Sequence, residues 1–197
     1  MKKLLIGSLL LWGAVCSGAQ AVTLHVAGGK LTGASGVEVD GVLYDVEFRD
    51  GTCIALFDGC DSASDFTFKD ETSAKHASQA LLDSVFIDQG DSTQAYDTNP
   101  ALTAGCGFPG ECVVVTPYSV AISPPSPLST ITAYNEDIIA TDAVFLTTLS
   151  RSTDTGPHLD VVFAVWTIAE VPEPSTVLLL TSGALGLLVR RPRRRRT

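Results

Sequence analysis

The chain has 197 residues, with 22 acidic and 13 basic side chains that are unevenly distributed. Eight basic residues lie near the two ends, so residues 22–171 keep five Lys and Arg against 21 Asp and Glu, a net charge of −16. Such a charge repels phosphate, which excludes nucleic acid and anionic lipid as partners of this central region. A solvated acidic surface is the plain interpretation, and divalent cation binding is the alternative.

The first 21 residues predict a secretory signal peptide. Two lysines precede an uncharged apolar run over residues 4–15, and the segment ends with Ala19-Gln20-Ala21. This order of basic, apolar and small-residue regions is typical of a signal that is cut between Ala21 and Val22. A short membrane anchor or a buried strand is the alternative, although the run is short for a span. We therefore expect the general secretion machinery to export the chain.

A β-hairpin is the clearest local structure after the cleavage site. Residues 22–25 alternate toward a first strand, and residues 37–39 and 42–49 flank Asp40-Gly41, a pair that tolerates the positive φ of a two-residue turn. Alternation places six side chains on one face: Val37, Val39, Val42, Tyr44, Val46 and Phe48. The other face is mostly charged, so the pattern predicts an antiparallel sheet with one buried and one solvated face.

Four cysteines lie in the exported region, at Cys53, Cys60, Cys106 and Cys112. An even number in a chain directed to an oxidising compartment predicts two disulfides. Pairing of Cys53 with Cys60 and of Cys106 with Cys112 is favoured, because each pair closes a short glycine-containing loop at low entropic cost. A zinc site is the alternative, but the spacings are long for zinc ligands and no histidine lies near either pair.

One amphipathic helix is predicted over residues 72–87, where apolar side chains recur at helical spacing. Asp70 or Thr72 can cap its N-terminus. Residues 88–109 are rich in Asp, Gly, Ser, Thr and Pro and predict a long loop, after which residues 112–120, 131–149 and 159–168 are β-prone. The whole predicts a mainly β or α+β domain over residues 22–170, with an antiparallel sheet, a β-hairpin and one helix.

No motif in the sequence predicts catalysis. The three histidines, His25, His76 and His158, are scattered, and no nucleophile elbow, zinc-protease helix or phosphate-binding glycine loop occurs. His76 falls near the start of the predicted helix among polar neighbours, where we expect an exposed or capping role. We therefore expect no catalytic residues and no enzyme, with a secreted hydrolase as the alternative.

Aspartate-rich loops are the one feature that suggests a ligand. Asp88, Asp91 and Asp97 surround Gly90 and offer the hard oxygen ligands that calcium takes. Their spacing is not that of a calcium-binding loop with a closing glutamate, and aspartate is also a preferred turn residue. Solvated turn residues are therefore the alternative, and no other cofactor is predicted.

Residues 171–197 form three consecutive pieces. The first is the motif Val171, Pro172, Glu173, Pro174 and Ser175, in which the prolines favour an extended chain. An uncharged stretch then runs to residue 189, long enough to nearly cross a bilayer as a helix at about 1.5 Å per residue. The last piece is basic and holds the end in the cytoplasm: Arg190, Arg191, Arg193, Arg194, Arg195 and Arg196.

This tripartite end resembles the PEP-CTERM sorting domain of Gram-negative bacteria, also called the ice-binding protein C-terminal domain. The resemblance covers residues 171–196 and implies that an exosortase, a membrane transpeptidase-like enzyme, recognises Pro172-Glu173-Pro174. It further implies transient residence in the inner membrane, followed by delivery to the outer surface or the extracellular matrix. Such proteins are typical of bacteria that make exopolysaccharide.

The upstream region resembles uncharacterised PEP-CTERM proteins with a stretch like Tyr44-Asp45-Val46 followed by Asp50-Gly51-Thr52-Cys53. That resemblance implies no activity. We expect a non-catalytic surface or matrix protein linked to exopolysaccharide or biofilm. The alternative is a secreted hydrolase or carbohydrate-binding module that acts on extracellular polysaccharide.

Overall fold

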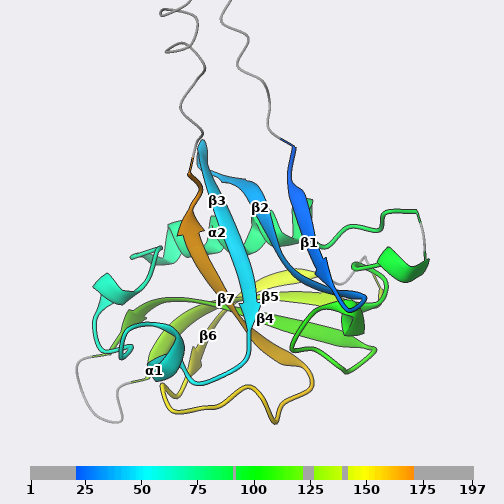
Figure 1. Cartoon of the computed structure of the whole chain (residues 1–197). Coiled ribbons are helices and arrows are strands. Elements are labelled where there is room, and N and C mark those ends of the chain that lie inside the picture. The colour runs from blue at the N-terminus through cyan, green and yellow to red at the C-terminus, as the bar shows by residue number, and fades with distance from the viewer. Residues whose placement is uncertain (1–20, 91, 122–126, 139–141, 171–197) are drawn as a thin grey trace, which may run out of the picture.

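The computed structural model describes residues 21–90, 92–121, 127–138 and 142–170, which form a single curved sheet with one main helix (Figure 1). The sheet has seven strands in the order β1-β2-β3-β7-β4-β5-β6, and only the β4–β7 pair is parallel. The strands are β1 Thr23–Ala27, β2 Lys30–Val39, β3 Val42–Arg49, β4 Glu111–Val120, β5 Leu128–Glu136, β6 Ala143–Leu149 and β7 Val161–Ile168. The mainly β prediction is confirmed.

The predicted hairpin joins β2 and β3. Val39 pairs with Val42, and Asp40 takes a positive φ of 52° in the turn, as its pairing with Gly41 indicated. Strand β2 starts seven residues before the predicted segment and is bulged between Ala34 and Val37. The prediction that Val42 is buried is wrong: this residue is 43% exposed, because β7 ends opposite Tyr44 and α2 packs against β2, where Val39 is buried.

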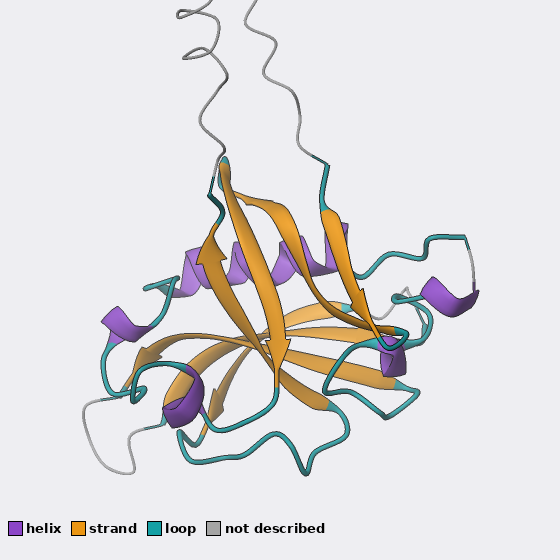
Figure 2. Cartoon of the chain, viewed as in Figure 1, coloured by secondary structure: helices purple, strands orange, loops and turns teal. Residues whose placement is uncertain are grey.

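The main helix, α2, spans Glu71–Ser84 and packs against strands from both arms of the sheet, β2 on one side and β4, β5 and β6 on the other. Its N-cap is Asp70, whose carboxylate accepts the backbone N–H of Ser73 at 2.9 Å. The helix ends three residues before the predicted boundary, and Val85 and Phe86 stay buried beyond it. Figure 2 shows α2 lying along the concave side of the sheet.

A second, smaller core lies on the opposite face of the central strands. Alternation along β4 and β7 turns Val114 and Val162 toward the main core, whereas Val115 and Phe163 enter the smaller one. Short helices cover this face: α1, Cys53–Leu56, and the 3-10 helix η1, Ala63–Asp65. The members of the smaller core are Cys53, Phe57, Cys60, Phe66, Val115, Leu128 and Phe163.

Both predicted disulfides are confirmed. Cys53 is bonded to Cys60 and Cys106 to Cys112, with 5.7 Å between the Cα atoms in each pair. The first bridge closes the loop that covers the smaller core, and the second joins the main core at the start of β4. The two bridges therefore stabilise opposite faces of the sheet.

The predicted β segment over residues 131–149 is two strands, β5 and β6, which pair antiparallel from Leu128 opposite Leu149 to Tyr134 opposite Ala143. Residues 88–90 and 92–109 are irregular as predicted, apart from the short 3-10 helices η2, Ser92–Gln94, and η3, Pro100–Leu102. The start of β1 and the end of β7 lie at the same end of the molecule (Figure 1).

Candidate functional site

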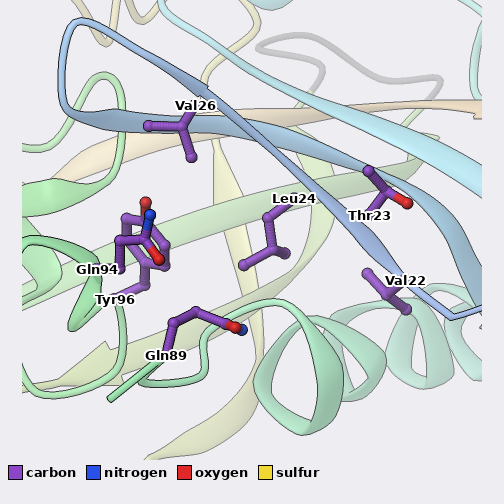
Figure 3. A pocket seen from close by; sticks show the side chains of 7 residues that line it. All are labelled: Val22, Thr23, Leu24, Val26, Gln89, Gln94 and Tyr96. Atoms are coloured by element: carbon purple, nitrogen blue, oxygen red, sulfur yellow. The ribbon is translucent and has the colours of Figure 1, made fainter. Parts of the chain in front are cut away.

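A cleft of about 330 Å³ lies between β1 and the loop that follows α2 (Figure 3). We call this loop, residues 88–98, the acidic loop. Strand β1 and the residue before it contribute Val22, Thr23, Leu24 and Val26. The acidic loop contributes two carboxamides and a phenol but no charge: Gln89, Gln94 and Tyr96. Backbone N–H of Gln89 donates to the carbonyl of Gln94 at 3.0 Å, which closes the loop across its neck.

The chemistry of this cleft is neutral. Its polar side chains are the amides of Gln89 and Gln94 and the hydroxyls of Thr23 and Tyr96. The Tyr96 hydroxyl is buried without a hydrogen-bond partner among the described residues. Burial also raises the pKa of Tyr96, so the phenol stays protonated at neutral pH. Such a cleft can bind a neutral hydroxylated or amide-bearing group, and no cysteine, histidine or carboxylate is among the described residues that line it.

The acidic loop also approaches the end of the β5–β6 hairpin, where Asp97 and Asp142 bring their carboxyl groups into contact. Burial raises the pKa of Asp97 to about 6, and the negative charges of Asp142 and Asp88 act in the same direction. Burial likewise raises the pKa of Asp142. One Asp97 oxygen, Oδ1, is buried and has no hydrogen-bond partner in the described part of the chain.

Asp88 has a different role from the one predicted for it. Its carboxylate accepts the backbone N–H groups of Asp97 and Thr98 at 3.0 and 3.2 Å and the Thr98 hydroxyl at 2.8 Å. Burial opposes the effect, but the hydrogen bonds from Thr98 and Asp97 lower the pKa of Asp88. These bonds occupy the carboxylate as a loop brace, and Asp91 lies outside the described residues. Calcium binding by this trio stays a prediction.

Within the described ranges, no group of three or more His, Cys, Asp and Glu side chains is placed to hold a metal ion. The histidines lie in three separate elements. His25 in β1 contacts the Ser35 hydroxyl at 2.9 Å, and His76 in α2 contacts Asp40 at 2.8 Å, as an exposed residue near the helix start. His158 is exposed in the turn after Thr155. None of them lines the cleft beside β1.

The folded region ends immediately before the predicted sorting segment. Ile168 is the last residue of β7 and pairs with Tyr44, and the backbone N–H of Ala169 donates to Leu43 at 2.9 Å. At the other end, Val22 packs against the main core and β1 begins at Thr23, one residue after the predicted cleavage bond. Removal of residues 1–21 would therefore leave every strand intact.

The remaining predictions for the chain ends concern residues that the structure does not describe. These are residues 1–20 of the signal peptide, the motif at Val171 to Ser175, the apolar stretch and the arginines. Among the residues that the structure does describe, no helix is both long and apolar enough to cross a membrane. The signal peptide and the transmembrane helix stay predictions.

Comparison with known proteins identifies the C-terminal segment. Residues 170–195 match the family model of the PEP-CTERM protein-sorting motif, which confirms that resemblance. No curated protein and no solved structure shows a significant match. The chain therefore carries a sorting signal that directs it toward the cell envelope and surface through the exosortase pathway, with an exosortase as its processing partner.

Sequence reasoning missed Gln89, Gln94 and Tyr96 as a cleft wall and Asp142 as the neighbour of Asp97. The local sequence around these four residues does not differ from that of an ordinary polar loop. Asn135, in contrast, gives a signal in the sequence, because a lone carboxamide in the β-branched run of β5 is a buried polar residue that needs a hydrogen-bond partner. Its amide nitrogen donates to the carbonyl of Tyr96 at 2.8 Å.

Proposed function

We propose that this protein is a non-catalytic component of the outer surface or extracellular matrix. In this proposal an exosortase recognises Pro172-Glu173-Pro174, cuts the chain nearby and releases the acidic domain to the exterior. The observation that carries the proposal is the family match at residues 170–195, which begins one residue after the last hydrogen bond of the sheet, at Ala169.

Four features of the domain support this proposal. Its cleft is lined by neutral side chains, and its exposed histidines lie in separate elements from the contacting carboxyl groups of Asp97 and Asp142. All four cysteines of the described region are bonded in disulfides, so none is a thiolate nucleophile. A net charge of −16 over residues 22–171 suits a hydrated polymer matrix better than an anionic membrane.

The test replaces Pro172, Glu173 and Pro174 by alanine in a host that makes an exosortase. Wild-type protein collected outside the cells should lack the arginine tail and end near Pro174. The variant should stay full length from Val22 and remain with the membrane fraction. Mass spectrometry of the C-terminus, together with cell fractionation, measures both outcomes.

A matched control replaces Pro125, Ser126 and Pro127 by alanine, since these two prolines also flank a single residue but lie outside the matched segment. This control should be processed like the wild type. Intact arginine tails on extracellular wild-type protein would contradict the proposal. Equal processing of the wild type and the motif variant would contradict it as well.

A further inference from the structure

Buried oxygen atoms without hydrogen-bond partners gather where the acidic loop meets the β5–β6 hairpin. Asn135 is fully buried in β5, and its Nδ2 donates to the carbonyl of Tyr96 at 2.8 Å. Its Oδ1 has no partner among the described residues, and the same holds for Oδ1 of the neighbouring Asp97. A buried amide oxygen without a partner costs free energy, so a ligand outside the protein chain is expected there.

The strand register adds a third oxygen donor. Tyr134 pairs with Ala143 in the β5–β6 ladder, so the next position opposite Asn135 is Asp142, on the same face of the sheet. The backbone N–H of Glu136 donates to Asp142 Oδ1 at 2.8 Å and fixes this carboxylate at the strand end. The loop residue Asp97 thereby meets Asn135 and Asp142, which lie far from it in the chain.

Two carboxylates in contact repel each other unless a positive charge lies between them or they share a proton. In the described part of the chain, neither Asp97 nor Asp142 forms an ion pair with a lysine or arginine. The fixed neighbours make the repulsion worse, because Asp88 and Glu136 add negative charge nearby. The protein itself thus supplies oxygen atoms and negative charge at this point, but no cation.

We propose that Asp97, Asn135 and Asp142 form a binding site for a divalent cation, with calcium as the best match. Two carboxylates and an amide carbonyl are hard oxygen donors, and calcium accepts such mixed sets with water completing its six to eight ligands. Asp97 and Asp142 are only half-buried, so water can reach the outer side of the ion. This site does not use Asp88, whose carboxylate braces the loop.

A cation at this site would tie the acidic loop to the end of the sheet. Asp97 belongs to the loop whose other side forms the cleft with β1, so the ion would also hold the wall that carries Gln94 and Tyr96. With only three side-chain ligands, we expect binding in the range of about 10⁻⁴–10⁻³ M that is typical of extracellular calcium modules.

The experiment measures thermal unfolding of the exported protein after removal of metal with EDTA, during titration with calcium to about ten millimolar, well above the expected Kd. The wild type should show a saturable rise of Tm that sodium chloride of equal ionic strength does not produce. Asp97→Asn and Asp142→Asn preserve side-chain volume and should lose this rise. Both variants should melt above the wild type in EDTA, because the carboxylate repulsion is gone.

Asp83→Asn is the matched control, because Asp83 is exposed on α2 and its loss changes the net charge equally. This control should keep the full calcium response. The proposal is overturned if calcium raises the Tm of the wild type no more than sodium chloride of equal ionic strength does. In that case the two carboxyl groups share a proton instead. It is also overturned if the Asn variants respond like the wild type, and a larger response to magnesium would overturn the assignment of calcium.

Discussion

The two faces of the sheet are covered in different ways. On the concave face, the 14-residue helix α2 contacts strands of both arms and closes a large continuous core. On the convex face, a seven-residue core lies under α1, η1 and the loop closed by Cys53 and Cys60. The difference shows that one face depends on helix packing, whereas the other depends on a covalently closed loop.

The same difference appears in the charged groups at the two covers. On the concave side, burial raises the pKa of Asp97 and of Asp142, and the negative charge of Asp142 adds to the rise at Asp97. On the convex side, the Ser62 and Asp61 backbone N–H groups donate to Asp65 and lower its pKa. The ionised form of Asp97 is therefore unfavourable beside the large core, whereas the ionised form of Asp65 is favourable in the loop that covers the small core.

The largest expected effect comes from the same substitution on each face. Leu81→Ala in α2 and Leu128→Ala in β5 both remove a fully buried leucine, and such changes cost about 2–5 kcal/mol of unfolding free energy. We expect Leu81→Ala in the upper half of that range, because Leu81 lies on the helix that joins both arms. Leu128→Ala should fall in the lower half, since a covering loop relaxes into the cavity more easily.

Urea denaturation of the two variants, with the wild type alongside, measures both values. If the Leu128 variant lost as much stability as the Leu81 variant, the two covers would be equally rigid and the comparison would fail. A changed denaturant slope would instead indicate a change in the surface exposed on unfolding.

The second-largest expected effect on stability comes from removal of the disulfides. Sequence separations of 7 and 6 residues predict that each bridge contributes about 2.5 kcal/mol through loop closure in the unfolded chain. Paired Cys→Ala changes should therefore cost similar amounts. Only the Cys53→Ala/Cys60→Ala protein should expose the aromatic cluster of Phe57, Phe66 and Phe163, because that loop is the cover itself.

Dye binding to exposed apolar surface and limited proteolysis distinguish the two double variants under native conditions. The Cys106→Ala/Cys112→Ala protein is the matched control, with the same chemical change on the other face. Equal dye binding by both would mean that α1 and η1 stay in place without their bridge.

The smallest effect is a pair of opposite pH dependences, measured without divalent cations. Asp97 has a raised pKa in the folded protein, so its protonation stabilises the fold at low pH, and this stabilisation is lost as pH rises from about 4 to about 6. Asp97→Asn should therefore gain stability relative to the wild type across that interval. Urea midpoints at a series of pH values between 3 and 8 measure the difference.

Asp65 should show the opposite sign. Its lowered pKa means that the carboxylate stabilises the fold above the ordinary value of 3.8, and that this contribution disappears as pH falls through the folded-state pKa. Asp65→Asn should lose stability relative to the wild type at neutral pH and match it in strong acid. The same sign for both variants would remove the electrostatic contrast between the two covers.

Local chemistry determined much of what the sequence predicted. The Asp40-Gly41 turn, the Asp70 cap and the short disulfide loops depend on neighbours within a few residues, and all appear in the structure. The sorting motif is likewise a linear pattern, which an enzyme can read without a fold, and the family match at residues 170–195 confirms it. These features can be predicted from the sequence because the residues that form each of them lie close together along the chain.

Only the tertiary structure decided which distant segments meet. The parallel contact of β4 with β7, the curvature around α2 and the second core depend on packing between residues that lie far apart in sequence. The meeting of Asp97, Asn135 and Asp142 has the same origin, because it requires the β5–β6 register and the hydrogen bond from Asn135 to Tyr96. No local propensity encodes such contacts, since their free energy arises only when the sheet closes around its helix.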